Sequence, residues 1–373
     1  MSHDLKSLLE LAKKAQIELN PALSPIQENG HFRMLASTDL PAGVTVFRQS
    51  AQARLQSSAQ VQFPGQVDPG IQLLHRLASE ASAPQSASVE LLLAATHSPE
   101  HTRSYNACYL SDADLTTLAS LHDILPAATH LLKNRIGQIC QYLLSIDSSL
   151  DRSVLENLAL NALRLGWFTS QFTPLTHLFR PCGLRGVRIV REGNDFVIRT
   201  PRPIRKGEEI FLSLGRQDIF DSVVSAPEFD AGLRYYIAFG SRLPQRIAAP
   251  FALKVVEHAS QSFPIGLSEK RDAYALQDPN ALLMESGPSA SLMAFFNAIA
   301  FTNPGELAKQ TPDQKTMKTF VQDALARLQA MNHVNRNGAL ITQPHLQKYV
   351  QAARRDQDIL TINQNWASDA FPA

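Results

Sequence analysis

The chain has 373 residues, of which 44% are hydrophobic and 18% are charged, a composition typical of a globular protein. Its formal net charge of +1 gives no general electrostatic reason to bind nucleic acid or an anionic membrane surface. The three cysteines, Cys108, Cys140 and Cys182, form no Cys-x-x-Cys pair, which argues against a disulfide framework and a structural zinc site.

The N-terminal residues, MSHDLKSLLELAKK, predict an amphipathic helix with charges throughout, a pattern unlike that of a signal peptide. No apolar run approaches the roughly 20 residues that a membrane-spanning helix needs. We therefore expect a cytoplasmic protein that makes no membrane contact. A chain of this length is expected to form two or three domains.

The first half of the chain predicts helices around a short β segment. Apolar spacing predicts a helix over residues 4–19, ended by Pro21 and Pro25. Residues 31–48 then predict two short strands around a turn at 39–43. A helical piece follows near residues 71–81, and helical periodicity dominates from about 89 to 167.

Residues 187–215 carry the strongest local pattern. Val187, Ile189, Phe196 and Ile198 alternate at period two, and residues 193–195 supply the turn of a hairpin. Residues 203–210 predict a compact charged turn, after which 211–214 resume the β pattern. After about residue 222 the pattern is helical, with frequent prolines as breaks.

Four segments, in this chain order, resemble motifs of the SET-domain protein methyltransferases. Residues 35–47 are similar to "L.A.RDI.AGE.LF", and residues 174–182 occupy the place of "P.AD..NHS". Residues 204–215 resemble the end of "R.I..GEEI..SYG", and residues 349–360 resemble "YR..QK.IL". The order matches the subgroup similar to the Rubisco large-subunit methyltransferase.

This resemblance covers nearly the whole chain and implies an α+β fold. We expect a β-rich SET-like core that is split by a helical insertion and followed by an all-α C-terminal domain. The core would comprise residues 1–50 and 168–221, the insertion 51–167, and a substrate-binding-like domain 222–373.

The resemblance also implies N-methylation of lysine or histidine in a protein or peptide partner, with S-adenosylmethionine as the cofactor. The cofactor-binding positions would be those of the family's Gly-x-Gly loop and Asn-His pair: Gly30, His31, Phe32, Phe179, Arg180, Pro181 and Cys182. Leu214 stands at the position of the family's catalytic tyrosine. Tyr235 and Tyr236, further along, could supply an aromatic group to the same site or could be core residues.

Three departures from the family pattern concern chemistry. Phe32 replaces the second glycine of the loop, neither Arg180 nor its neighbours supply the Asn-His pair, and Leu214 lacks the tyrosine hydroxyl. Arg180 could bind a cofactor carboxylate or could be a solvated loop residue. Together the departures predict a remodelled pocket. Three functions therefore remain open: a methyltransferase, a pseudoenzyme that binds a protein or peptide, and a SET scaffold with another small-molecule reaction.

Other candidate groups favour structural explanations. His97 and His101 have the i, i+4 spacing of a metal pair, but Pro99 between them argues against a continuous helix. We expect exposed or loop positions for these two residues and for His122 and His130, and no metal site. His177 and Cys182 lack the further signals of a thiol nucleophile. The arginines 180, 185, 188 and 191 are best explained by a solvated strand face.

Overall fold

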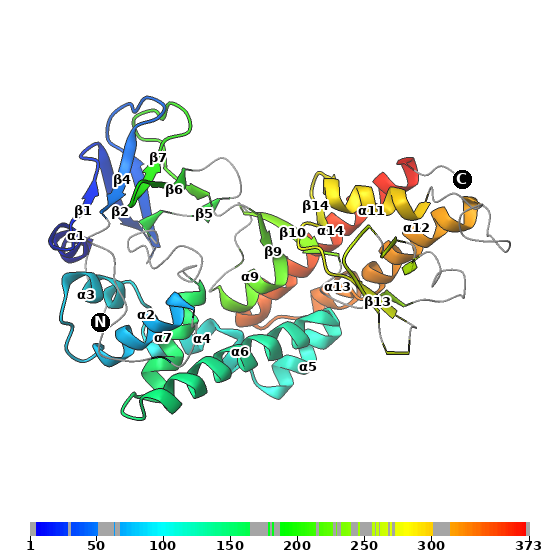
Figure 1. Cartoon of the computed structure of the whole chain (residues 1–373), viewed down its shortest axis with the longest axis horizontal. Helices are drawn as coiled ribbons and strands as arrows, with labels where there is room; N and C mark the ends of the chain where they lie inside the picture. The colour runs from blue at the N-terminus through cyan, green and yellow to red at the C-terminus, as the bar shows by residue number, and fades with distance from the viewer. Residues whose placement is uncertain are drawn as a thin grey trace. The chain divides into compact units, whose positions relative to one another are not determined.

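The computed structural model places the chain in two compact units (Figure 1). It describes residues 5–28, 31–50, 63, 68–164, 178–179, 181–182, 187–213, 216–226, 229, 233–239, 245–246, 256–257, 259–260, 262–267, 269–270, 273–300 and 314–370. Unit 1 comprises Met1–Tyr109, Thr129–Arg216 and Val224–Arg234, and unit 2 comprises Leu110–Ala128, Gln217–Val223 and Tyr235–Ala373. Among the described residues, no helix combines the length and the apolar character needed to cross a membrane.

Three helices of unit 1 begin at side chains that cap them. The described helices of this unit are α1 (Leu5–Lys14), α2 (Pro69–Ser79), α3 (Ala87–Ala94), α4 (Pro99–Tyr105), the short 3-10 helix η2 (Ala107–Tyr109), α6 (Ile124–Ile146), which belongs to this unit from Thr129 on, and α7 (Arg152–Arg164). The side chains of Asp68, Ser86 and Ser98 accept hydrogen bonds from the first free backbone N–H groups of α2, α3 and α4. These helices confirm the helical periodicity of the sequence.

The predicted N-terminal helix is too long at its C-terminal end. α1 ends at Lys14, and Gln16 adopts a left-handed backbone with φ of 55°. Residues Ile17–Leu19 then form β1, which pairs with β4 (Thr45–Gln49). The apolar residues Ile17 and Leu19 therefore belong to a strand. Pairing with β4 stabilises the extended conformation more than local propensity stabilises a helix.

The main sheet of unit 1 joins strands from both predicted β segments. Its order is β1-β4-β7-β6, with β6 at Arg188–Glu192 and β7 at Asp195–Arg199, and all neighbours are antiparallel. β6 and β7 form the predicted hairpin, with Gly193 (φ 58°) as the first of two loop residues. That position of a type II′ turn requires positive φ, which explains the glycine.

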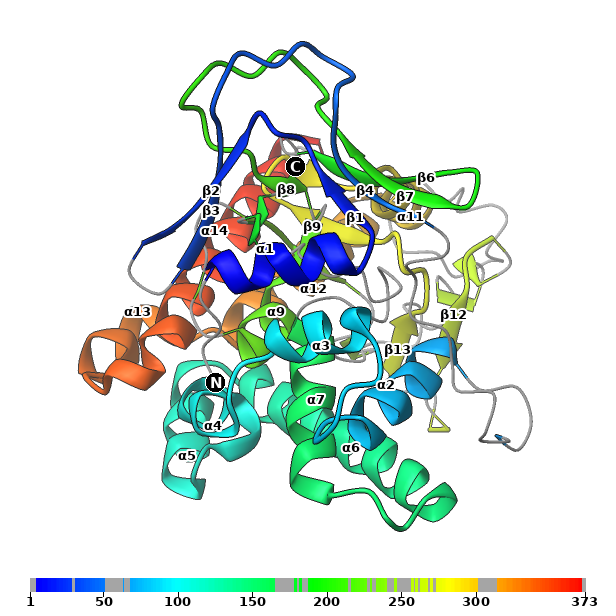
Figure 2. The ribbon, with the colours of Figure 1, turned by 90° about the vertical axis from the view of Figure 1, so that its left-hand side faces the viewer.

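Two turns lie side by side next to this sheet (Figures 1 and 2). β2 (Leu23–Glu28) and β3 (His31–Ala36) form a hairpin, and the chain after β3 forms the predicted turn at 39–43. Leu40 pairs with Ile204 of the charged turn, and the Gly43 N–H donates to the Thr200 carbonyl at 2.8 Å. The two turns are thereby held together by their backbones.

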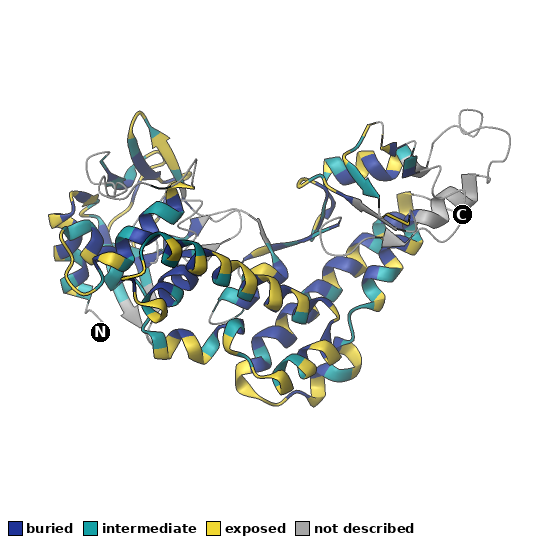
Figure 3. Ribbon diagram, turned by 60° about the horizontal axis from the view of Figure 1, so that its bottom comes forward, coloured by how far each residue is buried: buried dark blue, intermediate teal, exposed yellow. Residues whose placement is uncertain are grey.

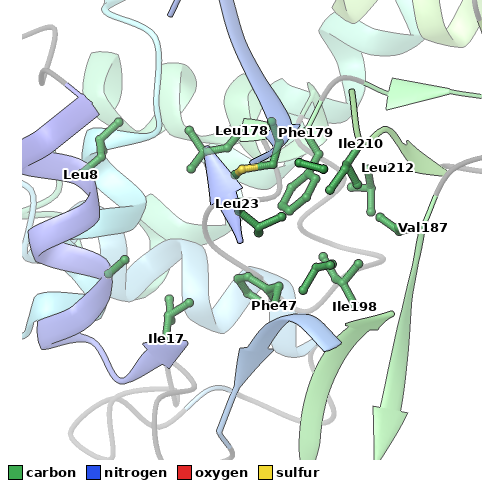
Figure 4. Packing of buried hydrophobic residues seen from close by; sticks show 14 of the residues in the cluster. Leu8, Ile17, Leu23, Phe47, Leu178, Phe179, Val187, Ile198, Ile210 and Leu212 are labelled. Carbon is green, nitrogen blue, oxygen red and sulfur yellow. The ribbon is translucent and has the colours of Figure 1, made fainter. Parts of the chain in front are cut away.

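One buried apolar cluster of unit 1 consists of aliphatic side chains and two phenylalanines (Figure 4). It includes Leu8, Leu11, Ile17, Met34, Phe47, Leu91, Leu178, Phe179, Val187, Ile198, Ile210 and Leu212. These residues come from α1, α3, the strands and the segments next to the strands, so this cluster packs α1 and α3 against the sheet. Figure 3 shows the matching alternation of buried and exposed faces along the helices.

Unit 2 corrects the prediction of an all-α C-terminal region. After residue 233 the described residues contain the strands β10 (Arg234–Ala238), β11 (Gln245–Arg246), β12 (Ile265–Leu267), β13 (Ala273–Leu276), β14 (Leu282–Met284) and β15 (Gly287–Pro288). They form sheets of order β15-β14-β10-β9, with β9 at Arg216–Asp218, and β11-β13-β12. Strands of two to five residues are too short for a period-two pattern to be read.

The helices of unit 2 surround an aromatic core. They are α5 (Asp112–Leu121), α9 (Ile219–Ser225), α11 (Ala290–Ala300), α12 (Gln314–Ala330), α13 (Val334–Asn337) and α14 (Gln347–Ala370), with the 3-10 helices η5 (Gly338–Leu340) and η6 (Pro344–Leu346). The ring of Phe296 packs on Phe239 at 5.2 Å and on Trp366 of α14 at 6.1 Å between centroids. These contacts join α14 to α11 and the strands.

Candidate functional site

Two of the predicted site segments form neighbouring strands in unit 1. β5 (Pro181–Cys182) runs parallel to β8 (Leu212–Ser213), with Pro181 opposite Leu212 and Cys182 opposite Ser213. Val187 also bridges to Leu212, and its N–H donates to the Phe211 carbonyl at 2.8 Å. The segment at the family's Asn-His position therefore lies beside the segment that leads to the tyrosine position.

The predicted cofactor loop is tied to the same segment through β3. Leu35 forms an antiparallel bridge with Glu209, and the Ile210 N–H donates to the Met34 carbonyl at 2.7 Å. In an antiparallel pair the start of one strand faces the end of the other. Toward its His31 end, β3 therefore runs beside the chain that continues from Glu209 into β8. All three motif segments thus lie next to residues 208–213.

An apolar wall supports this convergence. Phe179 is only 2% exposed and belongs to the same buried cluster as Val187, Ile210 and Leu212, as Figure 4 shows. The ring of Phe179 therefore anchors the segment before β5 in the core. Any contribution of Phe179 to ligand binding would be through the shape of the wall.

A partly buried ion pair crosses from β3 to the segment before β8. Oε2 of Glu209 accepts from Nε of Arg33 at 2.9 Å and lies 2.9 Å from Nη2 of the same guanidinium. The Glu209 side chain is 9% exposed and that of Arg33 is 32% exposed. Charge-assisted hydrogen bonds with such geometry are stronger than neutral ones, because a full charge lies on both partners.

The structure describes the remaining unit 1 candidates only in part. Gly30, Arg180 and Leu214 lie outside the described residues, and of His31, Phe32, Pro181 and Cys182 only the backbone is described. The predicted crowding by Phe32, the carboxylate contact of Arg180 and the role of Leu214 therefore stay predictions.

The two candidate tyrosines lie in unit 2. Both are on β10, where Tyr236 pairs with Met284 of β14. Tyr235 is 2% exposed, so its ring lies in the core of that unit, whereas Tyr236 is half-buried. A place for either ring in the catalytic chemistry stays a prediction.

The histidines 97 and 101 pack as aromatic rings. Ser98 caps α4 and Pro99 occupies its first turn, so only His101 is helical. The two rings meet edge to face at 4.5 Å with an interplanar angle of 71°, and Nδ1 of His97 lies 3.1 Å from the Tyr105 hydroxyl. Among the described residues, no three His, Cys, Asp or Glu side chains form a potential metal cluster.

His122 lies between α5 and α6, one of the two kinds of position expected for it, but the alternative of an exposed side chain is wrong. His122 is 1% exposed, and its Nε2 lies 3.2 Å from Oδ2 of Asp356 in α14. Nδ1 accepts a hydrogen bond from the Ile124 N–H at 3.2 Å, so the ring proton is on Nε2 and is donated to Asp356. The sequence neighbourhood gave no sign of this burial, because the partner lies 234 residues away.

Two cavities of unit 1 do not contain the predicted site residues. An open groove of about 640 Å³ follows one face of α6 and is lined by residues such as Lys133, Gln141 and Arg152. A small cavity of about 20 Å³ lies beside Glu209 and Ile210. It could hold about one water molecule, so it is too small for a cofactor.

The sequence analysis missed both the β5–β8 pairing and the Arg33–Glu209 pair. A two-residue parallel strand has no pattern of its own. Glu209 stands within the charged-turn motif and was treated there as part of a turn. Burial of the Glu209 carboxylate within a charged turn could be predicted only if β3, which carries its partner Arg33, were known to lie beside the turn.

Comparison with solved structures shows the fold. The chain is similar to the SET domain of LSMT bound to lysine and AdoHcy, with a TM-score of 0.63, 12% identity, and coverage of 98% of this chain and 91% of that one. It is similar to Rubisco LSMT bound to sinefungin and monomethyllysine (TM-score 0.63, 12% identity, coverage 99% and 92%). Rubisco LSMT bound to AdoMet gives a TM-score of 0.62 at 13% identity, with coverage of 99% and 92%.

No protein-family model and no curated protein matched the sequence. The structural likeness extends over nearly the whole chain and thus defines an α+β protein with the fold of the LSMT-type SET methyltransferase structures. The expected resemblance is confirmed at the level of fold.

Proposed function

We propose that this chain is an S-adenosylmethionine-binding SET-fold protein that methylates a lysine or histidine nitrogen of a protein partner. The observation that carries the proposal is the pairing of β5 with β8 beside the start of β3. It gathers the three segments that the SET motifs assign to cofactor and catalysis. The similar solved structures, which contain AdoMet, AdoHcy, sinefungin or lysine ligands, support the same choice.

We propose that the region around β5 binds a ligand with a flat apolar part and polar ends. In the part of the chain that the structure describes, β5 has a strand neighbour on one side only, so its other edge can offer backbone groups to a ligand. Phe179 and Leu212 supply a buried apolar wall close by. We propose that these groups, with Gly30, His31, Arg180 and Cys182, hold the cofactor.

The cofactor supplies an electrophilic methyl group, and the protein's task is mainly to orient the acceptor nitrogen and to exclude water. In this proposal Leu214 forms an apolar wall at the acceptor. Leucine excludes water but donates no hydrogen bond, and it attracts a cationic nitrogen less than an aromatic ring would. Slow transfer is the expected consequence.

The division of the chain follows the same proposal. Residues 1–50 and 168–221 would form the two parts of a SET core, with 51–167 as the insertion between them. The pairing of β4 with β7 supports this, because it joins strands from both parts. Residues 222–373 would contribute to binding of the protein partner, in a cytoplasmic setting.

The first test is direct binding of S-adenosylmethionine, measured by calorimetry with ATP as an adenine-containing control. We expect a dissociation constant in the micromolar range, which corresponds to a binding free energy on the order of −8 kcal/mol. Absence of binding at millimolar S-adenosylmethionine would overturn the proposal. The variant Arg180→Ala should bind more weakly, and unchanged affinity would remove Arg180 from the cofactor site.

A second candidate function is favoured by the departures at Phe32, Arg180-Pro181 and Leu214. The chain would then bind a protein or peptide without methyl transfer. Incubation of the wild type with labelled S-adenosylmethionine and a cell extract separates the two functions, since only a methyltransferase labels protein. The variant Leu214→Tyr tests the same point from the other side, because a competent site should gain transfer rate when the hydroxyl is restored.

A further inference from the structure

We propose that the Arg33–Glu209 ion pair is a positioning contact that holds the predicted cofactor loop against the strand segment leading into β8. The inference rests on the proposed function for the identity of the loop. The contact itself stands on its own geometry, in which two nitrogens of one guanidinium lie 2.9 Å from a single carboxylate oxygen. Neither residue belongs to a motif position that the SET resemblance assigns to cofactor or catalysis.

The position of the pair along β3 is what gives it this role. In the β2–β3 pair, Glu28 lies opposite His31, at the His31 end of β3. Backbone hydrogen bonds tie the other end of β3 to the charged turn, through the Ala36 N–H to the Glu208 carbonyl at 3.0 Å and the Ile210 N–H to the Met34 carbonyl at 2.7 Å. Among the contacts described between these two segments, the one that Arg33 makes lies nearest to His31.

Burial of the neighbouring residue Met34 determines which movement the ion pair can oppose. Met34, the next residue along, is 0% exposed and packs in the core with Ile210, so the two segments cannot separate without opening the core. The Arg33–Glu209 contact lies on the His31 side of Met34, so it adds a second point of attachment that would resist rotation of β3 about Met34. The Glu209 side chain, 9% exposed, is held in place by the bridge of its backbone to Leu35. The carboxylate is thus a fixed point and the guanidinium fork fits it.

The consequence for the site concerns geometry. A cofactor loop must hold its backbone within a fraction of an ångström of the productive position, and supporting contacts set that accuracy. Rotation of β3 about Met34 would move His31 and Phe32, two residues of the predicted loop, relative to β8. Loss of Arg33 should therefore weaken cofactor binding without unfolding unit 1.

The test uses the full chain with Arg33→Ala, Arg33→Lys and Glu209→Gln. Affinity for S-adenosylmethionine by calorimetry should fall about tenfold for Arg33→Ala and Glu209→Gln, in line with loss of one charge-assisted contact. Arg33→Lys keeps the charge but not the fork, so a smaller loss is expected. Amide hydrogen exchange without ligand should rise at residues 31–34 and 208–213. The charge-reversed double variant, Arg33→Glu with Glu209→Arg, should regain part of the affinity.

A matched control lies in the same unit. Arg48 donates to Asp195 at 2.8 Å and joins β4 to β7, with side chains 36% and 27% exposed. Arg48→Ala removes an arginine of similar exposure whose described ion-pair partners, Asp195 and Glu192, lie on β7 and β6 and not on β3 or β8. Its melting temperature should fall as much as that of Arg33→Ala, while its affinity for S-adenosylmethionine stays within about twofold of the wild type.

The outcomes separate cleanly. Equal loss of affinity in Arg48→Ala, or unchanged amide exchange at 31–34 in Arg33→Ala, would overturn the positioning role. A wild-type chain that binds no S-adenosylmethionine would overturn the proposed function instead, and the exchange data alone would then decide whether the pair holds the loop.

Discussion

The two units join distant parts of the chain by different means. In unit 1 the segments before residue 50 and after residue 187 are joined by the backbone pairing of β4 with β7, over a largely aliphatic cluster. In unit 2 the segment Leu110–Ala128 is joined to the C-terminal part by a single backbone bridge, His122 with Asn332, and by three histidine–aspartate contacts among the described residues: His122–Asp356, His333–Asp123 and His345–Asp114.

This difference has a physical meaning. Backbone hydrogen bonds do not depend on which side chain a residue carries, so the sheet of unit 1 is insensitive to most substitutions outside its core. The contacts of unit 2 depend on particular side chains, and their strength varies with burial. His122 and Asp356 are 2% exposed at the side chain, whereas His333, Asp123 and His345 are exposed to 30% or more. Variants at the two kinds of joint should therefore behave differently.

The largest effect is expected in the core of unit 1. Phe47 is 0% exposed and its residue pairs with Ile198 of β7. Phe47→Ala removes a ring and leaves a cavity, which should cost about 3–5 kcal/mol in the free energy of unfolding. Urea denaturation measures this value, with Leu131→Ala, 70% exposed in α6, as a control expected to change it by less than about 0.5 kcal/mol. A cost below about 1 kcal/mol would show that the sheet does not depend on this core.

The next effect concerns the buried histidine–aspartate contact of unit 2. Oδ2 of Asp356 accepts from His122 and, at 3.1 Å, from Nδ2 of Asn332. Asp356→Ala leaves the buried His122 ring and the half-buried Asn332 amide without this acceptor and should cost about 2–4 kcal/mol. The control Asp123→Ala breaks the exposed contact to His333 and should cost less than about 1 kcal/mol. Equal costs in urea denaturation would contradict a role of burial.

A third effect depends on pH. Burial lowers the pKa of Lys348 in α14 from 10.5 to about 7, even though its ammonium lies 4.8 Å from the Tyr349 ring centroid, a contact that favours the charged form. Between pH 7 and 10.5 the unfolded chain binds a proton that the folded chain has lost, so stability rises with pH across this window. Below pH 7 the full cost of burying the charge is present.

Lys348→Met should therefore raise the free energy of unfolding by about 1–2 kcal/mol at pH 6, and its advantage should shrink toward pH 10. Thermal denaturation at a series of pH values measures both. Lys6→Met, at an exposed position of α1, serves as the control without this pH trend. A constant difference between wild type and Lys348→Met across the pH series would refute the stated cause.

The smallest effect is expected at the exposed contact of α5. His345 lies 3.0 Å from Oδ1 of Asp114, with side chains 42% and 22% exposed. The Ser111 hydroxyl is the main cause of the lowered pKa of Asp114, and His345 adds less. His345→Ala should cost less than about 0.5 kcal/mol and Ser111→Ala, which removes the capping box, about 1 kcal/mol. The reverse order in thermal denaturation would show that the histidine, and not the cap, holds α5.

Much of the local structure was predictable from the sequence, for reasons that particular residues show. Gly193 between two alternating runs predicted the β6–β7 hairpin, because the turn needs positive φ and the runs need a buried face. The capped helices α2, α3 and α4 followed the same logic of local spacing and local hydrogen bonds. The strands of unit 2 did not, because each is too short to show a pattern without its neighbour.

The candidate site shows the same division. Its motif segments were named from residues alone, including the departures at Phe32 and Leu214. Their convergence on residues 208–213 could not be predicted from the sequence, because the parallel pairing of Cys182 with Ser213 leaves no local pattern. The Arg33–Glu209 contact likewise joins residues 176 apart in the sequence.

The sequence by itself thus determined local structure, namely the capped helices, the hairpin at Gly193 and the charged turn. It also determined the identity of the residues that a SET-like site would use. Only the tertiary structure decided that Ile17–Leu19 form a strand, that His122 is buried against Asp356, and that β5 lies beside β8. The physical reason is that a short strand or a buried polar group is stable only with its partner in place. Hydrogen bonds and burial supply that partner across long sequence separations, where local propensity carries no information.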